Sequence, residues 1–299
     1  MDVSNPDKII FPDAGFTKAD LVGHYERVGA RMLEYVAGRP LTLQRFPNGI
    51  GAKGFMQKNA GKHFPETIRR WSVPKRDGGT TNYPIVERAE DLAYLANQGT
   101  VTFHMWTTAV DRPTNPDWMV IDLDPEAGDI DAVRDATRIV AETLAEFGID
   151  GFPLATGSKG FHVWVPLDDD ADHNDVLRAS RAIAGLATNR YPDQLTTAFL
   201  KKNRAGRVFV DWLRNGPTAT VVAPYSLRPR RHAPIATPLR WTELGDTDPD
   251  RWTLDDMGDR LDVEPGVDPQ HLPVEQIVNA ALAAGVDLDT PHDRFGRNS

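Results

Sequence analysis

The chain has 299 residues, of which 40% are hydrophobic and 26% are charged, and its formal net charge at pH 7 is -9. This length and composition exclude a fibre or a disordered tail and predict one large or two small packed domains. Because the chain has no cysteine, disulfides and cysteine-ligated zinc or iron–sulfur sites are excluded. No stretch reaches the roughly 18 apolar residues of a membrane-spanning helix, and the N-terminus lacks signal-peptide features, so we expect a soluble cytoplasmic protein.

The N-terminal hundred residues are predicted to contain two helices and a strand. Residues 17–37 place apolar side chains on one helical face, with Thr17 as the N-cap and Gly38 as the stop. A strand over residues 41–46, a basic loop and a short helix over residues 89–97 follow. This region therefore predicts a mixture of helix and sheet.

The remainder of the chain is predicted to mix strands and helices. The expected strands cover residues 100–106, 118–124, 152–156, 161–166, 208–212 and 218–227. The expected helices cover residues 129–147 and 173–190. Short hairpins favour an α+β fold over a regular doubly wound sheet. Prolines over residues 229–273 predict an extended, wrapping segment, with a short helix over residues 273–285.

The negative charge is concentrated at one end of the sequence. Residues 241–299 hold 14 acidic and 4 basic side chains, a balance of -10, so the preceding 240 residues hold 29 acids and 30 bases, a balance of +1. Two basic clusters, residues 45–76 and 201–231, each contain eight bases and one acid. Aromatic side chains and a methionine interleave the first cluster, a mixture that suits single-stranded nucleic acid. A solvated charged face is the alternative interpretation.

The strand expected over residues 118–124 ends in a pair of carboxylates. Asp122 and Asp124 are two residues apart, so both side chains project from the same face, about 6.5 to 7 Å apart at the backbone. Carboxylates that close repel each other unless a cation compensates, and two oxygen donors on one strand suit Mg²⁺ or Mn²⁺. The alternative is that the acids only terminate the strand and cap the next turn.

A third carboxylate, Asp211, follows the apolar run Val-Phe-Val. A lone acid in such a place is costly unless it is paired or bound to a metal. Three aspartates on adjacent strand ends suit a two-metal centre for phosphoryl transfer, with ions about 3.5 to 4 Å apart. An ion pair with Arg214 or Arg207 is the alternative.

The sequence TGSKGFHVW over residues 156–164 predicts a tight turn with anion-binding features. Gly157 and Gly160 permit a turn whose amides can face an anion, Ser158 offers a hydroxyl and Lys159 a positive charge. The stretch is too short for a Walker A loop and opens no helix, which excludes a P-loop ATPase. An ordinary hairpin with a surface lysine is the alternative.

The chain resembles the bacterial primase-polymerases of the archaeo-eukaryotic primase superfamily. The resemblance lies in four motifs and in their order along the chain, namely the DxD pair, TGSKGFHV, an isolated aspartate on a later strand and PYSLRPR. The chain is similar to the polymerase domain of bacterial DNA ligase D and, in particular, to the stand-alone enzymes called Prim-PolC. The resemblance runs from NPDKIIFPDAGFTKADLVGHY to PYSLRPRRHAPIATPL near residue 240. It implies a primase-polymerase fold with mixed or antiparallel central sheets flanked by helices.

The resemblance also implies roles for individual residues at the reaction centre. Asp122, Asp124 and Asp211 are expected to bind two divalent ions, Mn²⁺ or Mg²⁺, with Asp211 nearest the primer 3′-hydroxyl. His104 and His162 correspond to histidines at the incoming NTP or dNTP. The residues expected to contact its sugar and triphosphate are Thr156, Ser158, Lys159, Gly160 and Arg228.

Further residues are expected to contact DNA. Lys8 and Lys18 have the spacing of two lysines that hold the 5′-phosphate on the downstream side of a gap. Phe55 and Met56 stand where relatives often carry two phenylalanines that stack on the template, and the methionine departs from that pattern. The basic residues expected at the DNA are Arg45, Lys53 and Lys58.

The resulting hypothesis is a template-dependent nucleotidyltransferase that fills short gaps in DNA during repair and prefers ribonucleotides. Residues 1–240 are expected to form the catalytic domain, in which 1–100 bind DNA and its 5′-phosphate and 101–240 bind metal and nucleotide. Residues 241–299 are expected to pack on it as an acidic segment and to discourage non-specific DNA binding.

The expected partners are gapped or primer–template DNA with a downstream 5′-phosphate, NTP or dNTP, and a separate DNA ligase, with no membrane association. We expect a monomer located in the cytoplasm at the nucleoid. Two rival hypotheses are a non-catalytic module that binds or bridges DNA ends and a DxD-type metal-dependent glycosyltransferase.

Overall fold

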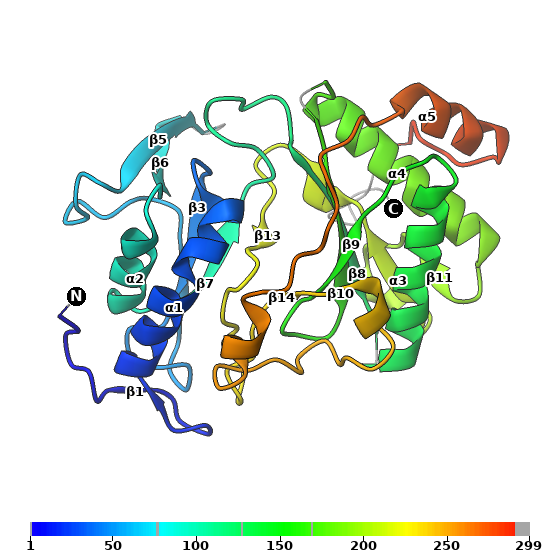
Figure 1. Cartoon of the computed structure of the whole chain (residues 1–299). Helices are drawn as coiled ribbons and strands as arrows, with labels where there is room; N and C mark the ends of the chain where they lie inside the picture. Colours follow the sequence, from blue (N-terminus) through cyan, green and yellow to red (C-terminus); the bar gives the residue numbers. More distant parts are fainter. Residues whose placement is uncertain (1, 76–77, 127, 169, 291–299) are drawn as a thin grey trace. The chain divides into compact units, whose positions relative to one another are not determined.

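The structure is a computed structural model that describes residues 2–75, 78–126, 128–168 and 170–290. Arg76, the last base of the first basic cluster, and residues 291–299 of the acidic segment lie outside the described residues. The chain divides into two compact units, each described by itself (Figure 1). The first comprises Met1–Pro113, Thr220–Thr237 and Asp250–Val263, and the second comprises Thr114–Ala219, Pro238–Pro249 and Glu264–Ser299.

The first unit is built on a four-stranded antiparallel sheet and two helices. In sheet order, its strands are β13 (Val221–Val222), β7 (Thr100–Met105), β3 (Leu41–Arg45) and β4 (Phe55–Gln57). The helices α1 (Lys18–Val36) and α2 (Ala89–Asn97) pack on each other. Two ribbons complete the unit, formed by β1 (Ile9–Phe11) with β2 (Phe16–Thr17) and by β5 (Arg69–Pro74) with β6 (Thr80–Ile85).

Helix α1 begins and ends where the sequence predicts. The Thr17 side chain accepts a hydrogen bond from the Asp20 amide, while the Asp20 carboxylate accepts one from the Thr17 amide at 2.7 Å, which makes a capping box. Beyond the last turn, Gly38 has a φ of 67°, a conformation that glycine adopts without steric cost. The apolar stripe that covers the core consists of Leu21, Tyr25, Val28 and Met32.

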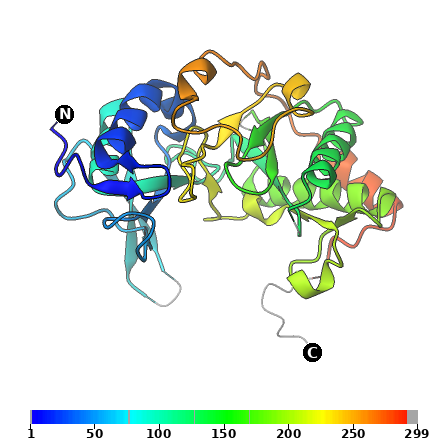
Figure 2. The ribbon, with the colours of Figure 1, turned by 90° about the horizontal axis from the view of Figure 1, so that it is seen from below.

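The second unit contains a six-stranded sheet with helices packed on it. In sheet order, the strands are β11 (Leu195–Thr196), β12 (Val208–Asp211), β8 (Trp118–Asp124), β10 (Phe161–Pro166), β9 (Phe152–Ala155) and β14 (Thr237–Pro238). The helices are α3 (Ile130–Ala145), α4 (His173–Arg190) and α5 (Val274–Ala283). Helices α3 and α4 contact each other and β8, and Figures 1 and 2 place both on the same side of that strand. Helix α5 packs on α4.

The alternation along β8 separates apolar from acidic side chains. Met119, Ile121 and Leu123 alternate with Asp122 and Asp124, and the three apolar residues are fully buried. Because successive side chains of a strand point to opposite faces, the two aspartates project from the face opposite to that of these apolar residues. The sheet therefore presents both carboxylates on one face.

The α+β prediction is confirmed, but the prediction of a strand over residues 218–227 is wrong. The only strand within this range is β13; Leu227 makes an isolated antiparallel bridge with Ile235, and residues 218, 224 and 225 lie in turns. Thr218 and Tyr225 have φ values of 62° and 64°, which a strand cannot contain. The Ser226 amide donates to the Ala223 carbonyl and thereby closes one of these turns.

The basic loop predicted after residue 46 contains three strands instead. β4 extends the main sheet of the first unit, and β5 and β6 form a hairpin. The side chains of β5 are exposed or half-buried along its whole length, and the half-buried Trp71 and Val73 are its only large apolar residues. Two such positions among arginines are a weak strand signal in a sequence.

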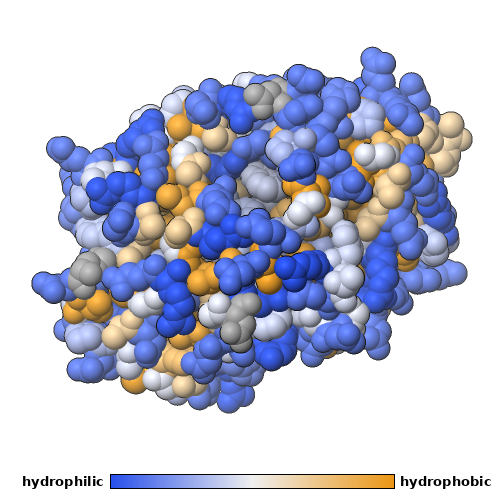
Figure 3. All heavy atoms as spheres, viewed as in Figure 1, coloured by the Kyte–Doolittle hydropathy of each residue, from blue (hydrophilic) through white to orange (hydrophobic). Residues whose placement is uncertain are grey.

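The C-terminal region is irregular rather than a separate core. Residues 229–273 contribute β14 and the short helical turns η3 (Trp241–Glu243) and η4 (Met257–Arg260), and they belong partly to each unit. The division of the chain at residues 100 and 240 stays a prediction. Among the described residues, no helix is both long and apolar enough to cross a membrane. In the view of Figure 3, hydrophilic residues cover most of the surface and hydrophobic residues form small separate patches.

Candidate active site

Three neighbouring strands of the second unit align acidic and imidazole side chains in one row. In the antiparallel registers, Asp211 of β12 lies opposite Asp122 of β8, and Asp122 lies opposite His162 of β10. Directly opposed residues of adjacent strands have Cβ atoms about 4.5 to 5.5 Å apart. Asp124 lies two residues further along β8, opposite Phe209. The structure thus brings all three predicted aspartates to one end of one sheet face.

Arg214 forms ion pairs with two of these carboxylates. Its Nε lies 3.0 Å from Asp122 Oδ2 and 3.2 Å from Asp211 Oδ2. The second oxygen of Asp211 accepts a hydrogen bond of 2.9 Å from the Leu213 amide. Of the two ion-pair partners considered for Asp211, Arg214 is therefore the one observed, while Arg207 donates to three backbone carbonyls. These ion pairs do not exclude metal binding, because one guanidinium offsets only one of the three negative charges.

Asn215 fixes the turn that carries Arg214. The turn η2 (Leu213–Asn215) follows β12, and the Asn215 side chain is fully buried. Its Oδ1 accepts a hydrogen bond from the Val120 amide at 2.8 Å, and its Nδ2 donates to the carbonyls of Val120 at 2.8 Å and Trp212 at 2.9 Å. These bonds attach the turn to β8, so the end of β12 is held against the strand that carries Asp122.

His162 has its hydrogen-bonding orientation set by Trp164. The Trp164 indole donates to His162 Nδ1 at 3.3 Å. An indole N–H can only donate, so Nδ1 carries no proton and the ring proton resides on Nε2. That nitrogen lies 3.4 Å from Asp122 Oδ1 and points its N–H toward the carboxylate. His162 is 4% exposed and Trp164 is fully buried, so the pair forms a rigid support for Asp122.

The carboxylates differ in pKa because their neighbours differ. Burial alone raises the pKa of Asp122, but His162 and Arg214 more than offset it and hold that pKa below its ordinary value. The charge of Asp122, followed by burial, raises the pKa of Asp124 to about 6. Burial is the main cause that raises the pKa of Asp211. One guanidinium therefore leaves the three carboxylates with an excess of negative charge, and this all-oxygen donor set fits Mg²⁺ or Mn²⁺.

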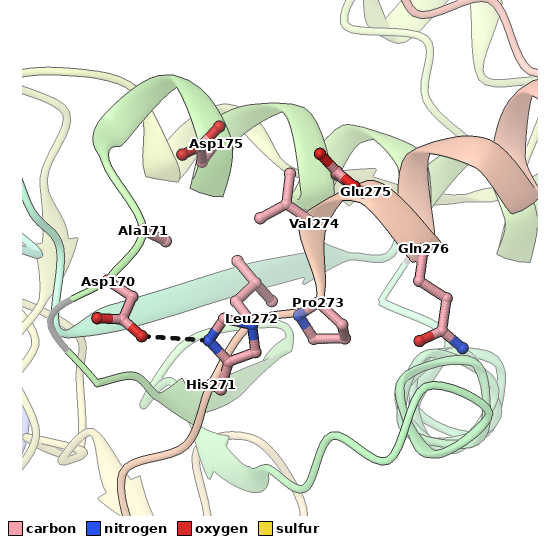
Figure 4. A pocket seen from close by; sticks show the side chains of 9 residues that line it. All are labelled: Asp170, Ala171, Asp175, His271, Leu272, Pro273, Val274, Glu275 and Gln276. Carbon is pink, nitrogen blue, oxygen red and sulfur yellow. Dashed lines mark ion pairs between the residues drawn. The ribbon is translucent and has the colours of Figure 1, made fainter.

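A second group of possible metal ligands lies elsewhere in the second unit. The donor atoms of Asp168, Asp170 and His271 all lie within 4.8 Å of one another, a spacing that the predicted aspartates do not meet within the described part of the chain. His271 Nδ1 is 3.4 Å from Asp170 Oδ2, beside a pocket of about 470 Å³ (Figure 4). Because Asp170 and His271 are largely exposed, their contact is also explained as a surface ion pair.

The loop between β9 and β10 packs tightly against the end of β8. A Cβ on Gly160 would lie 1.9 Å from the Leu123 carbonyl oxygen, so only glycine fits there. The Thr156 hydroxyl donates to the Gly160 carbonyl at 2.7 Å, while Lys159 is exposed and Ser158 half-buried. The Gly157 amide donates to the Pro249 carbonyl at 2.8 Å, so this amide is not directed at an anion.

His104 and Arg228, which were predicted at the nucleotide, belong to the first unit. His104 lies on β7 between Thr42 of β3 and Val222 of β13, and its side chain is half-buried. The Arg228 amide donates to the Pro234 carbonyl at 2.8 Å in an irregular segment. Their roles at the nucleotide stay predictions.

The two lysines predicted to hold the 5′-phosphate are brought together by backbone pairing. The Lys18 amide donates to the Lys8 carbonyl at 2.8 Å. Lys18 Nζ donates to the carbonyl and the hydroxyl of Ser4, each at 2.7 Å, and Lys8 Nζ donates to Asn48 Oδ1 at 3.1 Å. Burial, followed by the charge of Lys8, lowers the pKa of Lys18. The two cations therefore share one site, beside a hollow of about 520 Å³ lined by Asn5, Asp7 and Lys8.

The predicted DNA-stacking residues lie on β4, at the edge of the first unit's main sheet. Phe55 and Met56 are 48% and 50% exposed, and as successive strand residues they point to opposite faces. The Arg45 guanidinium lies 5.5 Å from the Phe55 ring centroid, within cation–π range. Lys53 precedes β4 in the sequence and Lys58 follows it, and both side chains are exposed.

Sequence reasoning did not find Asn215, Trp164 or Ser4, and it considered Arg214 only as an alternative. Asn215, Ser4 and Arg214 each contact a residue that is distant in the sequence, at separations of 95, 14 and 92 positions. Only Trp164 carried a local signal, since it lies two residues from His162 and therefore on the same face of the strand.

Comparisons with known proteins identify the family of this fold. The model of the family described as LigD, primase-polymerase domain, matches residues 17–270. The chain is 36% identical over 253 residues to the multifunctional non-homologous end joining DNA repair protein LigD of Mycobacterium tuberculosis (strain H37Rv), covering 82% of this chain and 33% of that protein. It is 30% identical over 285 residues to the LigD protein of Pseudomonas aeruginosa, covering 94% and 34%. The chain thus spans about a third of the length of these curated relatives.

A solved structure gives the same result over nearly the whole chain. The polymerase domain from Mycobacterium tuberculosis ligase D in complex with DNA superimposes with a TM-score of 0.78 at 31% identity and covers 96% of each chain. This likeness confirms the expected fold. The chain belongs to the LigD primase-polymerase domain family.

Proposed function

We propose that this protein is a template-dependent nucleotidyltransferase that fills short gaps in DNA during the repair of broken ends. The observation that carries the proposal is the placement of Asp211, Asp122 and Asp124 on adjacent strands in a chain of this family. The similar proteins are named for DNA repair by end joining, and the similar structure is a polymerase domain in complex with DNA.

In the proposed reaction, the primer 3′-hydroxyl loses its proton to solvent and its oxygen attacks the α-phosphorus of the nucleotide. The bond from this phosphorus to the bridging oxygen breaks, and pyrophosphate leaves. Asp122, Asp124 and Asp211 would hold the divalent ions, Mg²⁺ or Mn²⁺, which would supply positive charge to activate the hydroxyl and to stabilise the leaving group. Asp211 is assigned to the primer side, and His162 holds Asp122 in place through its Nε2–H.

The loop after β9 is assigned to the nucleotide. Gly160 contacts the Leu123 carbonyl, one residue before Asp124, so the loop of Thr156, Ser158 and Lys159 stands beside the carboxylates. Lys159 is exposed and offers its charge to the triphosphate. We assign His104 and Arg228 to the same nucleotide. The proposal also includes a preference for ribonucleotides over deoxyribonucleotides and for Mn²⁺ over Mg²⁺.

The first unit is assigned to the DNA. Lys8 and Lys18 are proposed to bind the downstream 5′-phosphate, and Phe55 is proposed to stack on a template base beside Arg45, Lys53, Met56 and Lys58. Because Phe55 and Met56 point to opposite faces, only one of them can stack on a given base. Sealing of the resulting nick is assigned to a ligase activity outside residues 1–299.

The decisive experiment measures incorporation of labelled NTPs and dNTPs on a one-nucleotide gap, with and without the 5′-phosphate, in Mg²⁺ and in Mn²⁺. The double variant Asp122→Ala with Asp124→Ala should abolish extension and leave DNA binding largely intact. The matched control is Asp131→Ala with Asp135→Ala, two exposed acids of α3, which should extend the primer like the wild type. Full extension by the first double variant would rule out the assignment.

The same exposed aromatic and basic residues around β4 also suit a module that only binds or bridges DNA ends. That function predicts salt-sensitive DNA binding without incorporation at any metal concentration. The incorporation assay on the wild-type protein separates the two functions.

A further inference from the structure

Arg214 occupies the point at which two of the proposed metal ligands converge. Both Asp122 Oδ2 and Asp211 Oδ2 face its Nε, at 3.0 Å and 3.2 Å. The other oxygen of each carboxylate has a different neighbour, His162 Nε2 at 3.4 Å for Asp122 and the Leu213 amide at 2.9 Å for Asp211. The two Oδ2 atoms are therefore the pair that a cation bridging these carboxylates would take.

A guanidinium nitrogen and a metal ion cannot share that point. Divalent ions of this class bind oxygens at about 2.0 to 2.2 Å, and the two oxygens must close on the ion to do so. In the structure both Oδ2 atoms are instead in contact with the Arg214 Nε, at 3.0 Å and 3.2 Å. The arginine thus supplies a single fixed positive charge at the place of the ion.

The arginine side chain can leave without unfolding its turn. The Arg214 side chain is 39% exposed, whereas those of Asp122 and Asp211 are 9% and 6% exposed. The backbone of the turn is held independently by the three hydrogen bonds of Asn215. Rotation of one half-exposed side chain is therefore enough to release both carboxylates.

We propose that Arg214 is a competing cation that pairs with Asp122 and Asp211 without metal and must be displaced before a divalent ion binds between them. Arg214 thereby sets the metal concentration at which the reaction begins. This inference rests on the proposed function, because it assigns a regulator to the same carboxylates. Arg214 acts through the carboxylates and is in this sense a positioning residue.

Arg214→Gln tests the proposal because glutamine keeps a planar polar head but removes the charge. Mn²⁺ affinity of the nucleotide-free protein, followed by the electron paramagnetic resonance of free Mn²⁺, should rise about tenfold, which corresponds to about 1.4 kcal/mol. In EDTA, the variant should unfold at a lower temperature than the wild type because the carboxylates then repel each other, and Mn²⁺ should raise its Tm more than that of the wild type. The Mn²⁺ concentration for half-maximal incorporation should fall by a similar factor.

Two further variants keep the result interpretable if Arg214→Gln does not fold. Arg214→Lys retains the charge and should bind Mn²⁺ within about twofold of the wild type. Arg207→Gln, which removes a guanidinium that donates to three backbone carbonyls, is the matched control and should leave Mn²⁺ affinity unchanged. If Arg214→Lys bound Mn²⁺ about as much more tightly than the wild type as is expected of Arg214→Gln, the role of the charge would be overturned.

The outcomes separate this inference from the proposed function. Unchanged or weaker Mn²⁺ binding by Arg214→Gln, with a wild-type protein that incorporates nucleotides, overturns the competing-cation role and leaves the polymerase assignment standing. A wild-type protein that incorporates no nucleotide in either metal overturns the polymerase assignment instead.

Discussion

Asp211 lies directly opposite Asp122 across the antiparallel pair of β12 and β8. The turn after β12 maintains this register, because Asn215 attaches that turn to Val120 of β8. The two carboxylates are thus aligned by a buried amide that has no charge of its own. An amide that makes three buried hydrogen bonds should be sensitive to truncation.

Asn215→Ala should destabilise the protein by about 3 kcal/mol, because it leaves the buried N–H and C=O of Val120 without their partner. Incorporation should fall with it, since Asp211 and Arg214 lose their support. Urea unfolding and the gap-filling assay measure both effects. Asn189→Ala, which removes one exposed hydrogen bond to the Ala284 carbonyl, is the control and should change the free energy of unfolding by less than about 0.5 kcal/mol. An Asn215→Ala protein as stable as this control would contradict the assignment.

Gly160→Ala should disrupt the junction between the nucleotide loop and β8. The new Cβ would meet the Leu123 carbonyl oxygen at 1.9 Å, and that oxygen belongs to the backbone of the sheet. We expect a loss of stability of about 2 kcal/mol or more, as for other overpacked sites, and a loss of nucleotide incorporation.

The same change at Gly23 is the matched control, because a Cβ there would meet nothing within 4 Å. In the middle of α1, alanine should stabilise the helix by about 0.5 to 1 kcal/mol. Thermal unfolding of both variants checks the contrast, and a Gly160→Ala protein that is as stable as the wild type would show that the loop can shift.

Lys8→Ala should weaken binding to a gap that carries a 5′-phosphate more than binding to an unphosphorylated gap. The structure places Lys8 and Lys18 next to each other, with the Lys18 ammonium held by Ser4, so removing one lysine lowers the positive charge at a single site. We expect about tenfold weaker binding to the phosphorylated gap, measured by fluorescence anisotropy. The slope of log K against log salt concentration should become shallower by about one released counterion. Lys53→Ala is the control and should weaken both gaps equally; equal losses for Lys8→Ala would contradict a phosphate site.

The sequence predicted the features that depend on local patterns. The helix that begins at Thr17 and the acidic end of β8 follow from capping and alternation, which involve residues close in the sequence. The strand pairing that brings Asp211 opposite Asp122 involves residues 89 positions apart, and no local pattern states which strands are neighbours.

The features that the sequence did not predict each have an identifiable physical cause. Tyr225 interrupts a run that is apolar enough for a strand, because its φ of 64° ends the extended conformation. The sequence indicates Arg214 as a possible ion-pair partner of Asp211, but its second contact, with Asp122, depends on the tertiary fold. Ser4 carries no pattern at all, and its contact with Lys18 joins residues 14 positions apart in the sequence.

His24 should make the stability of the protein fall as the pH falls below about 6.5. This residue of α1 is 1% exposed, and its Nε2 lies 2.9 Å from the Tyr225 carbonyl oxygen, to which it donates. Burial lowers its pKa from 6.5 to about 4. Between these two values the unfolded chain takes up a proton that the folded protein refuses, so acidification favours unfolding. The full effect is about 3 kcal/mol and is reached near pH 4, while above pH 7 it is absent.

His24→Gln isolates this contribution, because a glutamine amide can still donate to the Tyr225 carbonyl but does not titrate. Urea unfolding of the wild type at pH 7.5 and pH 5 should show a loss of stability that exceeds the loss in His24→Gln by about 2 kcal/mol. The exposed His232 provides the control, and His232→Gln should keep the wild-type dependence on pH. If the pH dependence of His24→Gln equalled that of the wild type, the folded protein would accept the proton, and the interior around Tyr225 would have to solvate a charged imidazole.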